Sequence, residues 1–247
     1  MPDVTFQEKR FAIWGDVTVL TPYDIYQSNG DTRVLKDQWE SLQAWLDKTV
    51  VRDESFLWSP SNQQLGDWLD PSAPEDRPDD SQSDTILVAN AFLIQSTRVA
   101  SQIARLLDLQ TDAERYETDL QRMLSAFRHK YITPSGLVMS DTQATLALVL
   151  QFDIVPSESR AETAKRLVWH IRRRAFKVLT GFAGTPVILP ALTKSGHVNI
   201  AYRMFQEEQC PSILYPISMG ATTIWERWNS MMPDGTVNKG EMTSFNQ

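Results

Sequence analysis

Residues 84–108 read DTILVANAFLIQSTRVASQIARLLD, and this stretch decides the fold class. Residues that a protein core accepts recur three and four positions apart, which is the spacing of one face of an α-helix. The face consists of Ile86, Leu87, Asn90, Leu93, Ile94, Thr97, Ile103, Leu106 and Leu107. We therefore expect a long helix with one wide buried stripe.

The same spacing recurs on both sides of this stretch. It predicts further helices over residues 31–50, 112–130, 158–176 and 197–209. The connecting segments, notably 59–82 and 231–241, are rich in Pro, Gly and Asp, which favour loops. Long helices joined by such loops indicate an all-α fold of stacked helical hairpins. Composition alone leaves a bundle, a solenoid and a toroid open.

Length and composition bound the interpretation further. The chain has 247 residues and no long flexible linker, so we expect one domain over residues 1–247. A single cysteine, Cys210, excludes an internal disulfide framework. The N-terminal residues lack the apolar core of a signal peptide, and no run reaches the ~18 apolar residues of a membrane span. We expect a soluble chain without a membrane partner, while its compartment stays open.

Charge argues against nucleic acid as a partner. The net charge is −7 with a pI near 5.0, and a phosphate backbone would repel such a surface. One basic run, Arg172 to Arg174, follows His170 on a predicted helix. With Trp169 and Phe176 expected to pack inward, this run is typical of a solvated face rather than a phosphate clamp.

The stretch GATTIWERWNS, residues 220–230, is the best candidate for chemistry. Glu226 stands between Trp225 and Arg227, with Trp228 next. Tryptophan rings stack on the C–H faces of sugars, and a neighbouring carboxylate can accept a hydroxyl or activate a water. The alternative is an ordinary helix start, in which Thr222 or Thr223 caps the helix and Glu226 completes a capping box.

Two further clusters combine an indole, a glycine and an acid. They are Trp14-Gly15-Asp16 and Gly66-Asp67-Trp68. Each can line a sugar site, because the ring offers an apolar wall, the acid accepts hydroxyls and the glycine admits a close approach. The alternative is that both tryptophans belong to the core and that Asp16 and Asp67 cap helices.

The run GATTIWERWNSMMPDG (Gly220 to Gly235), with PSILYPISMG before it and MTSFN after it, resembles the catalytic signature of the α-L-rhamnosidases of glycoside hydrolase family 78. Further matches follow in order: AIWGDVTVLTPYDIYQSNGD (12–31), QLGDWLDP (64–71) and TGFAGTPVILPAL (180–192). The resemblance covers nearly the whole chain. It implies an (α/α)6 toroid of helical hairpins with the sugar site in the loops at one end, and here an incomplete one.

The resemblance also implies roles. Glu226 matches the general base of an inverting enzyme that releases terminal α-L-rhamnosyl residues from glycosides, and Arg227 beside it could keep the carboxylate ionised. Trp14, Asp16, Asp67, Trp68, Arg227 and Trp228 match substrate-binding positions. Neither a metal nor an organic cofactor is implied, and the partner is a rhamnose-containing glycoside.

This sequence departs from the family's pattern at both ends. The general-acid motif, Asp-x-x-x-Asp-Glu-Arg-x-Gly-Trp, is not found: the first ten residues hold Asp3, Glu8 and Arg10 without that pattern. The sugar-binding histidine expected beyond Ser244-Phe245-Asn246 is also missing, and Ile213 stands where tryptophan is common. We expect a truncated catalytic domain whose folding needs the missing barrel segments or a partner.

Two alternative functions remain open at this point. One is an inactive fragment or carbohydrate-binding remnant of the same fold, because the acid motif is absent. The other, more distant, is a metal-dependent terpenoid enzyme, suggested by Asp79, Asp80 and Asp84, although capping of the next helix explains these residues more simply. The three histidines, at positions 129, 170 and 197, lie too far apart in sequence to predict a zinc site.

Overall fold

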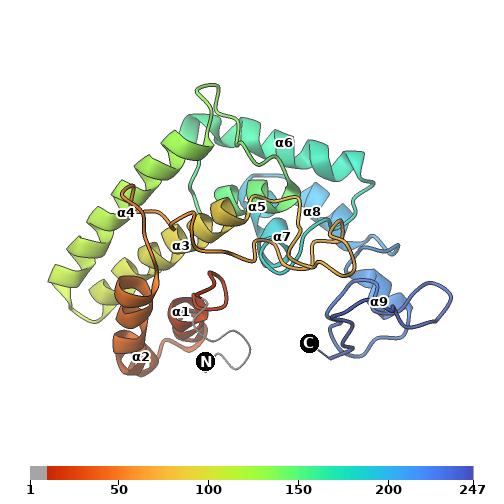
Figure 1. The fold of residues 1–247 in the computed structure, drawn as a ribbon, viewed down its shortest axis with the longest axis horizontal. Helices are drawn as coiled ribbons and strands as arrows, with labels where there is room; N and C mark the ends of the chain where they lie inside the picture. Colours follow the sequence, from red (N-terminus) through yellow and green to blue (C-terminus); the bar gives the residue numbers. More distant parts are fainter. Residues whose placement is uncertain (1–9, 247) are drawn as a thin grey trace. The chain divides into compact units, whose positions relative to one another are not determined.

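The computed structural model describes residues 10–246 of the chain. Within that range it contains nine α-helices, α1 to α9, together with a π-helical turn, η1, and a 3-10 turn, η2 (Figure 1). Extended pairing among these residues consists of two isolated bridges, Arg52 with Trp58 and Met231 with Val237. The prediction of an all-α protein is therefore confirmed.

The chain forms two compact units. Unit 1 contains residues 10–65 and 86–132 of the described chain, and unit 2 contains residues 66–85 and 133–246. The expectation of one domain over 1–247 stays a prediction. Residues 1–9 lie outside the described residues. They include Asp3 and Glu8, which were considered above for the general acid. They also include the N-terminal residues in which no signal peptide is expected. No helix in residues 10–246 has the length and apolar character needed to cross a membrane.

Unit 1 is built from α1 (Val17–Asn29), α2 (Arg33–Gln43), η1 (Ala44–Thr49), α3 (Thr85–Leu106) and α4 (Gln110–Tyr131). Helices α1 and α2 pack against each other. Between them the chain turns at Gly30, whose φ of 73° is left-handed and whose N–H donates to the carbonyl of Tyr26 at 2.7 Å. Glycine adopts this conformation without steric cost, so it ends α1 and starts the return.

Helices α3 and α4 form an antiparallel pair (Figure 1). Near one end of the pair Asn90 Nδ2 donates to the Tyr131 hydroxyl at 3.4 Å, and near the other Ser101 Oγ donates to the Ala113 carbonyl at 3.1 Å. Most of the predicted stripe of α3 is buried, whereas Leu106 is 39% exposed. The stripe is therefore confirmed from Leu87 to Ile103, whereas Ile86 is half-buried and Leu107 lies beyond the helix.

Unit 2 holds α5 (Gln143–Gln151), η2 (Ser157–Ser159), α6 (Arg160–Arg173), α7 (Thr185–Lys194), α8 (Val198–Phe205) and α9 (Leu214–Ser218). Helix α5 contacts both α6 and α7, and α7 contacts α8. Eight of the nine residues of α5 are buried, which fits its sequence QATLALVLQ. A helix that is apolar on all sides is satisfied only at the centre of a packed layer, so α5 forms the core of this unit.

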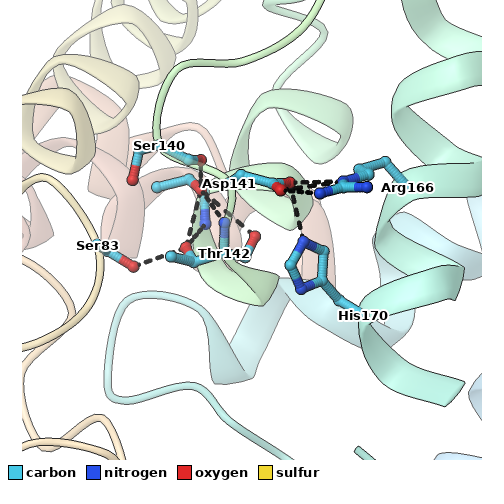
Figure 2. A network of polar contacts seen from close by, with 7 residues as sticks. Ser83, Ser140, Asp141, Thr142, Arg166 and His170 are labelled. Carbon is cyan, nitrogen blue, oxygen red and sulfur yellow. Dashed lines mark hydrogen bonds and ion pairs between the residues drawn. The ribbon is translucent and has the colours of Figure 1, made fainter. Parts of the chain in front are cut away.

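Polar contacts fix the start of α5. Thr142 caps the helix through a reciprocal pair of bonds with Thr145, and its hydroxyl also meets Ser83 Oγ at 2.8 Å. Figure 2 shows the carboxylate of Asp141 between Arg166 and His170 of α6, with His170 Nε2 at 2.9 Å. This network ties the beginning of α5 to the face of α6.

The structure corrects the expectation for the basic run of α6. Trp169 does not pack inward, since 41% of its surface is exposed. Leu167 and Ile171 are the buried residues at this level of the helix. Phe176 lies beyond the end of α6 and is half-buried. The run from Arg172 to Arg174 therefore borders an exposed indole rather than a purely polar face.

Each of the five predicted helices is present. They correspond to α2 with η1, to α3, to α4, to η2 with α6, and to α8, and their ends differ by a few residues from the predicted ones. Four further helices, α1, α5, α7 and α9, were not predicted. Three of them contain proline, which weakens a helical pattern in sequence, and the fourth, α5, lacks a polar face.

Candidate active site

Residues 221–230, which follow α9 in unit 2, form a loop without helical structure. The alternative of a helix start capped by Thr222 or Thr223 is therefore wrong. Trp225 is buried, and its ring meets that of Phe245 edge-on, with centroids 5.1 Å apart. This contact holds the loop against residues 244–246, so the segment MTSFN shapes the loop that carries Glu226.

Glu226 is half-buried and is bonded twice to Ser244. Its backbone N–H donates to the Ser244 carbonyl at 2.9 Å, and the Ser244 N–H donates to its Oε2 at 3.0 Å. The other carboxylate oxygen, Oε1, accepts no hydrogen bond from residues 10–246. The carboxylate is thus fixed through one oxygen, while the second is left for an outside donor.

Arg227 does not pair with its neighbour Glu226 among the described residues. Instead its Nε donates to the carbonyl of Glu241 at 2.7 Å, and its Nη2 donates to the carbonyl of Glu75 at 2.8 Å. The guanidinium therefore fastens the 226 loop to two other loops of unit 2. The structure gives no support to the idea that Arg227 keeps Glu226 ionised by direct contact.

Asp67 is fully buried and holds the turn before α7. Its Oδ2 accepts the N–H of Gly181 at 2.8 Å, and its Oδ1 accepts the N–H groups of Ala183 and Gly184 at 3.0 and 2.9 Å. These donors stand just before Thr185, the first residue of α7. The carboxyl group of Asp67 thus caps the backbone N–H groups at the start of α7, although more than one hundred residues of sequence separate them.

Burial raises the pKa of Asp67 to about 7, because water no longer solvates the charged form. The N–H groups of Gly181, Gly184 and Ala183 oppose this shift, since they stabilise the carboxylate, while nearby Asp70 adds to it. A carboxyl group whose oxygens are engaged by protein donors is well suited to positioning the backbone. The prediction that Asp67 contacts the sugar stays untested.

Gly181 and Trp68 lie in direct backbone contact. A Cβ on Gly181 would stand 2.0 Å from the carbonyl oxygen of Trp68, so only glycine fits. That carbonyl also accepts the N–H of Phe182 at 2.8 Å. Trp228 contacts the same segment, since its Nε1 lies 3.5 Å from the carbonyl oxygen of Thr180. Unit 2 therefore brings two predicted sugar-binding tryptophans, Trp68 and Trp228, to one loop, residues 180–184.

Trp14 and Asp16 belong to unit 1. Asp16 is 1% exposed; its Oδ1 accepts Trp45 Nε1 at 2.9 Å and Ser96 Oγ at 2.8 Å, while its Oδ2 accepts the N–H of Ile13 at 2.8 Å. It stands at the cap position of α1, yet its side chain makes no cap bond to that helix. Burial raises its pKa, and these three bonds oppose the rise.

Trp14 is 37% exposed, which leaves much of its ring accessible within unit 1. Packing within unit 1 requires the glycine beside it. A Cβ on Gly15 would stand 2.0 Å from the ring of Trp45, so this glycine makes room for a buried indole. No pattern in the sequence singles out Trp45, although its ring packs against Gly15 and its Nε1 donates to Asp16.

Two of the three aspartates at positions 79, 80 and 84 take part in local contacts. Asp80 forms an ion pair with Arg77, and the backbone N–H of Asp84 donates to Ser140 Oγ at 3.1 Å, one residue before α3. Residues 10–246 contain no group of three or more His, Cys, Asp or Glu side chains arranged to hold a metal ion. The aspartates therefore carry no argument for the terpenoid alternative.

Known proteins are similar to this chain in sequence and in structure. The family described as the bacterial alpha-L-rhamnosidase 6 hairpin glycosidase domain matches residues 1–247. An alpha-L-rhamnosidase of Streptomyces avermitilis is 39% identical over 233 residues, which are 94% of this chain and 22% of that protein. One from Formosa agariphila is 30% identical over 248 residues, covering 100% of this chain and 26% of that protein.

Solved structures give the same result. The native alpha-L-rhamnosidase of Aspergillus terreus is 40% identical with a TM-score of 0.94, over 97% of this chain and 28% of that one. The Streptomyces avermitilis alpha-L-rhamnosidase in complex with L-rhamnose is 36% identical with a TM-score of 0.82, over 94% and 21%. The chain thus spans about a quarter of the length of the relatives it matches. It belongs to the six-hairpin glycosidase domain family of the bacterial α-L-rhamnosidases.

Proposed function

We propose that this chain contributes the base side of a rhamnosidase site, in which terminal α-L-rhamnosyl residues are released from glycosides with inversion. Glu226 is the general base. Family membership supports the substrate class, as does the relative whose structure was solved in complex with L-rhamnose. The observation that carries the assignment is the carboxylate of Glu226, which Ser244 fixes through Oε2 and which has Oε1 unbonded within residues 10–246.

The chemistry follows from that arrangement. In an inverting hydrolysis a water attacks the anomeric carbon from the face opposite the leaving group and gives its proton to a carboxylate. Glu226 Oε1 can accept that proton while Oε2 keeps its bond to Ser244. The glycosidic C–O bond breaks as the new bond forms, and a second carboxyl group, roughly 6.5–9.5 Å from the first, protonates the leaving oxygen.

Trp68 and Trp228 are proposed to form apolar walls for the sugar. Both lie at the loop 180–184 of unit 2, which supports a shared role. The apolar faces of indole rings suit the C–H faces and the methyl group of a 6-deoxy sugar. Trp14 stays a predicted third wall. Substrate binding by Asp16, Asp67 and Arg227 also stays a prediction; their bonds to the protein support a role in positioning.

The proposal has a consequence for substrates, because the sequence contains no copy of the general-acid motif. An aryl leaving group of low pKa departs without protonation, whereas an alkyl alcohol does not. The test is therefore hydrolysis of 2,4-dinitrophenyl α-L-rhamnoside and of methyl α-L-rhamnoside by the purified chain and its Glu226→Gln variant. We expect hydrolysis of the dinitrophenyl substrate only, with initial formation of β-L-rhamnose seen by proton NMR and a loss of at least about 100-fold in the variant.

Two results would contradict the proposal. Equal rates for the chain and Glu226→Gln would remove Glu226 as the base, and initial release of α-L-rhamnose would exclude inversion. The chain could also cleave neither substrate while L-rhamnose, but not D-mannose, raises its unfolding temperature. That result would favour a carbohydrate-binding remnant over an enzyme. Indifference to both sugars would leave the inactive-fragment alternative.

A further inference from the structure

Unit 2 contains a surface pocket that none of the predicted site residues lines. It has a volume of about 550 Å³, and it lies between α6 and the start of α8. Its lining residues are Lys165, Val168, Trp169, Arg172, Arg173 and His197. Three of the lining side chains, Lys165, Arg172 and Arg173, carry a positive charge, so the pocket is a cationic site with one aromatic wall.

Two of the positive charges of this pocket have no acidic partner. Arg172 and Arg173 form no ion pair with any of residues 10–246. Lys165 does have a partner, Glu162, at 3.2 Å, although both side chains are more than two-thirds exposed, and such pairs are weak. In a chain of net charge −7, a concave group of unpaired cations indicates an anionic ligand.

Trp169 gives the pocket its shape. Two guanidinium groups lie over its ring, that of Arg166 at 4.3 Å from the centroid and that of Arg173 at 5.0 Å. Arg166 is itself held by the carboxylate of Asp141, as Figure 2 shows. Stacking uses the flat face of a guanidinium and leaves the N–H groups in its plane available. Arg173 is therefore presented as a planar donor beside an apolar wall.

We propose that this pocket binds an anionic saccharide, that is, a sugar residue carrying a carboxylate or a sulfate ester. The planar fork of an arginine matches both groups through paired hydrogen bonds. With two guanidinium groups over its ring, Trp169 still has 41% of its surface exposed, and this exposed part favours a sugar ring over a bare ion because it adds apolar contact area. The volume suits a ligand of one or two sugar units. This inference does not depend on Glu226, since binding is measured without hydrolysis.

The test is calorimetric titration of the purified chain at low ionic strength. One arm uses digalacturonic acid with its methyl ester as the neutral control, and the other uses a sulfated disaccharide with its unsulfated form. We expect at least one charged probe to bind at least about tenfold more tightly than its neutral control, and the affinity to fall as salt rises. Excess L-rhamnose should not displace the bound probe, because the two sites are separate.

The basic run supplies a matched pair of variants. Arg173→Ser removes a charge that lines the pocket, whereas Arg174→Ser removes the same charge one residue further on, outside it. We expect the first to weaken binding at least about tenfold and the second less than about threefold. Trp169→Leu keeps an apolar side chain. It should weaken the binding of the charged saccharide more than the binding of inorganic sulfate. Circular dichroism checks that each variant is folded.

Three outcomes would overturn the proposal. Absence of binding for both charged probes would show that the pocket holds no anionic saccharide. Equal losses in Arg173→Ser and Arg174→Ser would reduce the effect to general attraction by a basic surface. Equally tight binding of a short glutamate peptide would assign the pocket to an acidic protein segment instead.

Discussion

Glu226 and Ser244 hold each other through two hydrogen bonds, one between their backbones at 2.9 Å and one from the Ser244 N–H to Oε2 of Glu226 at 3.0 Å. A backbone donor cannot rotate away as a hydroxyl can, so the orientation of the carboxylate is set by the loop itself. The position of the candidate base thus depends on the backbone of Ser244, 18 positions later in the sequence.

Removing this backbone donor should disturb the base without removing it. Ser244→Pro deletes the N–H, whereas Ser244→Ala keeps it and loses only the hydroxyl. We expect the proline variant to lower kcat on the dinitrophenyl rhamnoside about 10- to 100-fold, because Oε2 loses its anchor, and the alanine variant to stay within about threefold. Steady-state kinetics on both variants checks this. Equal losses would mean that the hydroxyl, or the loop as a whole, is what matters.

Gly181 should tolerate no side chain. A Cβ there would lie 2.0 Å from the carbonyl oxygen of Trp68 and 2.5 Å from that of Asp67. We expect Gly181→Ala to lower the free energy of unfolding by at least about 2 kcal/mol, measured by urea denaturation. The control is Gly196→Ala, where φ is +81° but open space surrounds the site, and a loss of about 1 kcal/mol is expected. Similar losses in both would contradict the crowding argument.

The stability of the chain should depend on the ionisation of Asp67. Its pKa in the folded protein is raised to about 7 from 3.8, so the folded state keeps this proton where the unfolded state has lost it. Stability from this group is full below about pH 4 and falls by about 2–4 kcal/mol as the pH rises to about 7. Asp67→Asn cannot ionise, so its unfolding free energy should lack this fall. Parallel pH curves for the chain and the variant would refute the assignment.

Asp16 should matter for the stability of unit 1. Replacing it with asparagine places an amide N–H₂ where one carboxylate oxygen now accepts a bond from Ile13, Trp45 or Ser96. We expect Asp16→Asn to cost about 1–3 kcal/mol in urea denaturation, because a buried donor is left unsatisfied. Asp24→Asn, an exposed position on α1, should change stability by less than about 0.5 kcal/mol. A cost near zero for Asp16→Asn would argue that its carboxylate serves a ligand.

The sequence predicted long amphipathic helices well and enclosed ones poorly. Helix α3 was predicted because core residues recur three and four positions apart over its 22 residues and polar residues gather in its second half. Helix α5 was missed because neighbours cover it on every side, so its sequence needs no polar face and shows no periodicity. Helix α7 was missed for another reason, since Pro186 and Pro190 interrupt its pattern, although the first stands in the opening turn where proline is tolerated.

At the candidate site the sequence identified residues but not their partners. It singled out Asp67 and the stretch 180–192 separately, yet no local signal says that Asp67 accepts the N–H groups of Gly181 and Gly184. The expectation that Trp169 packs inward was wrong, because the arginines one turn away on each side lie over its ring and 41% of its surface is exposed. Contacts between distant segments are set by tertiary packing, which spacing along one helix does not encode.

The contact between Asp67, Trp68 and the loop 180–184 also limits how this domain can be recombined with its relatives. Two short segments, far apart in sequence, meet through backbone atoms with no space between them. A chimera that inherits one segment from one parent and its counterpart from another will keep this contact only if both parents place the loop 180–184 at the same distance from Asp67 and Trp68. Crossover points for engineered rhamnosidases should therefore exchange residues 64–71 and 180–192 as a pair.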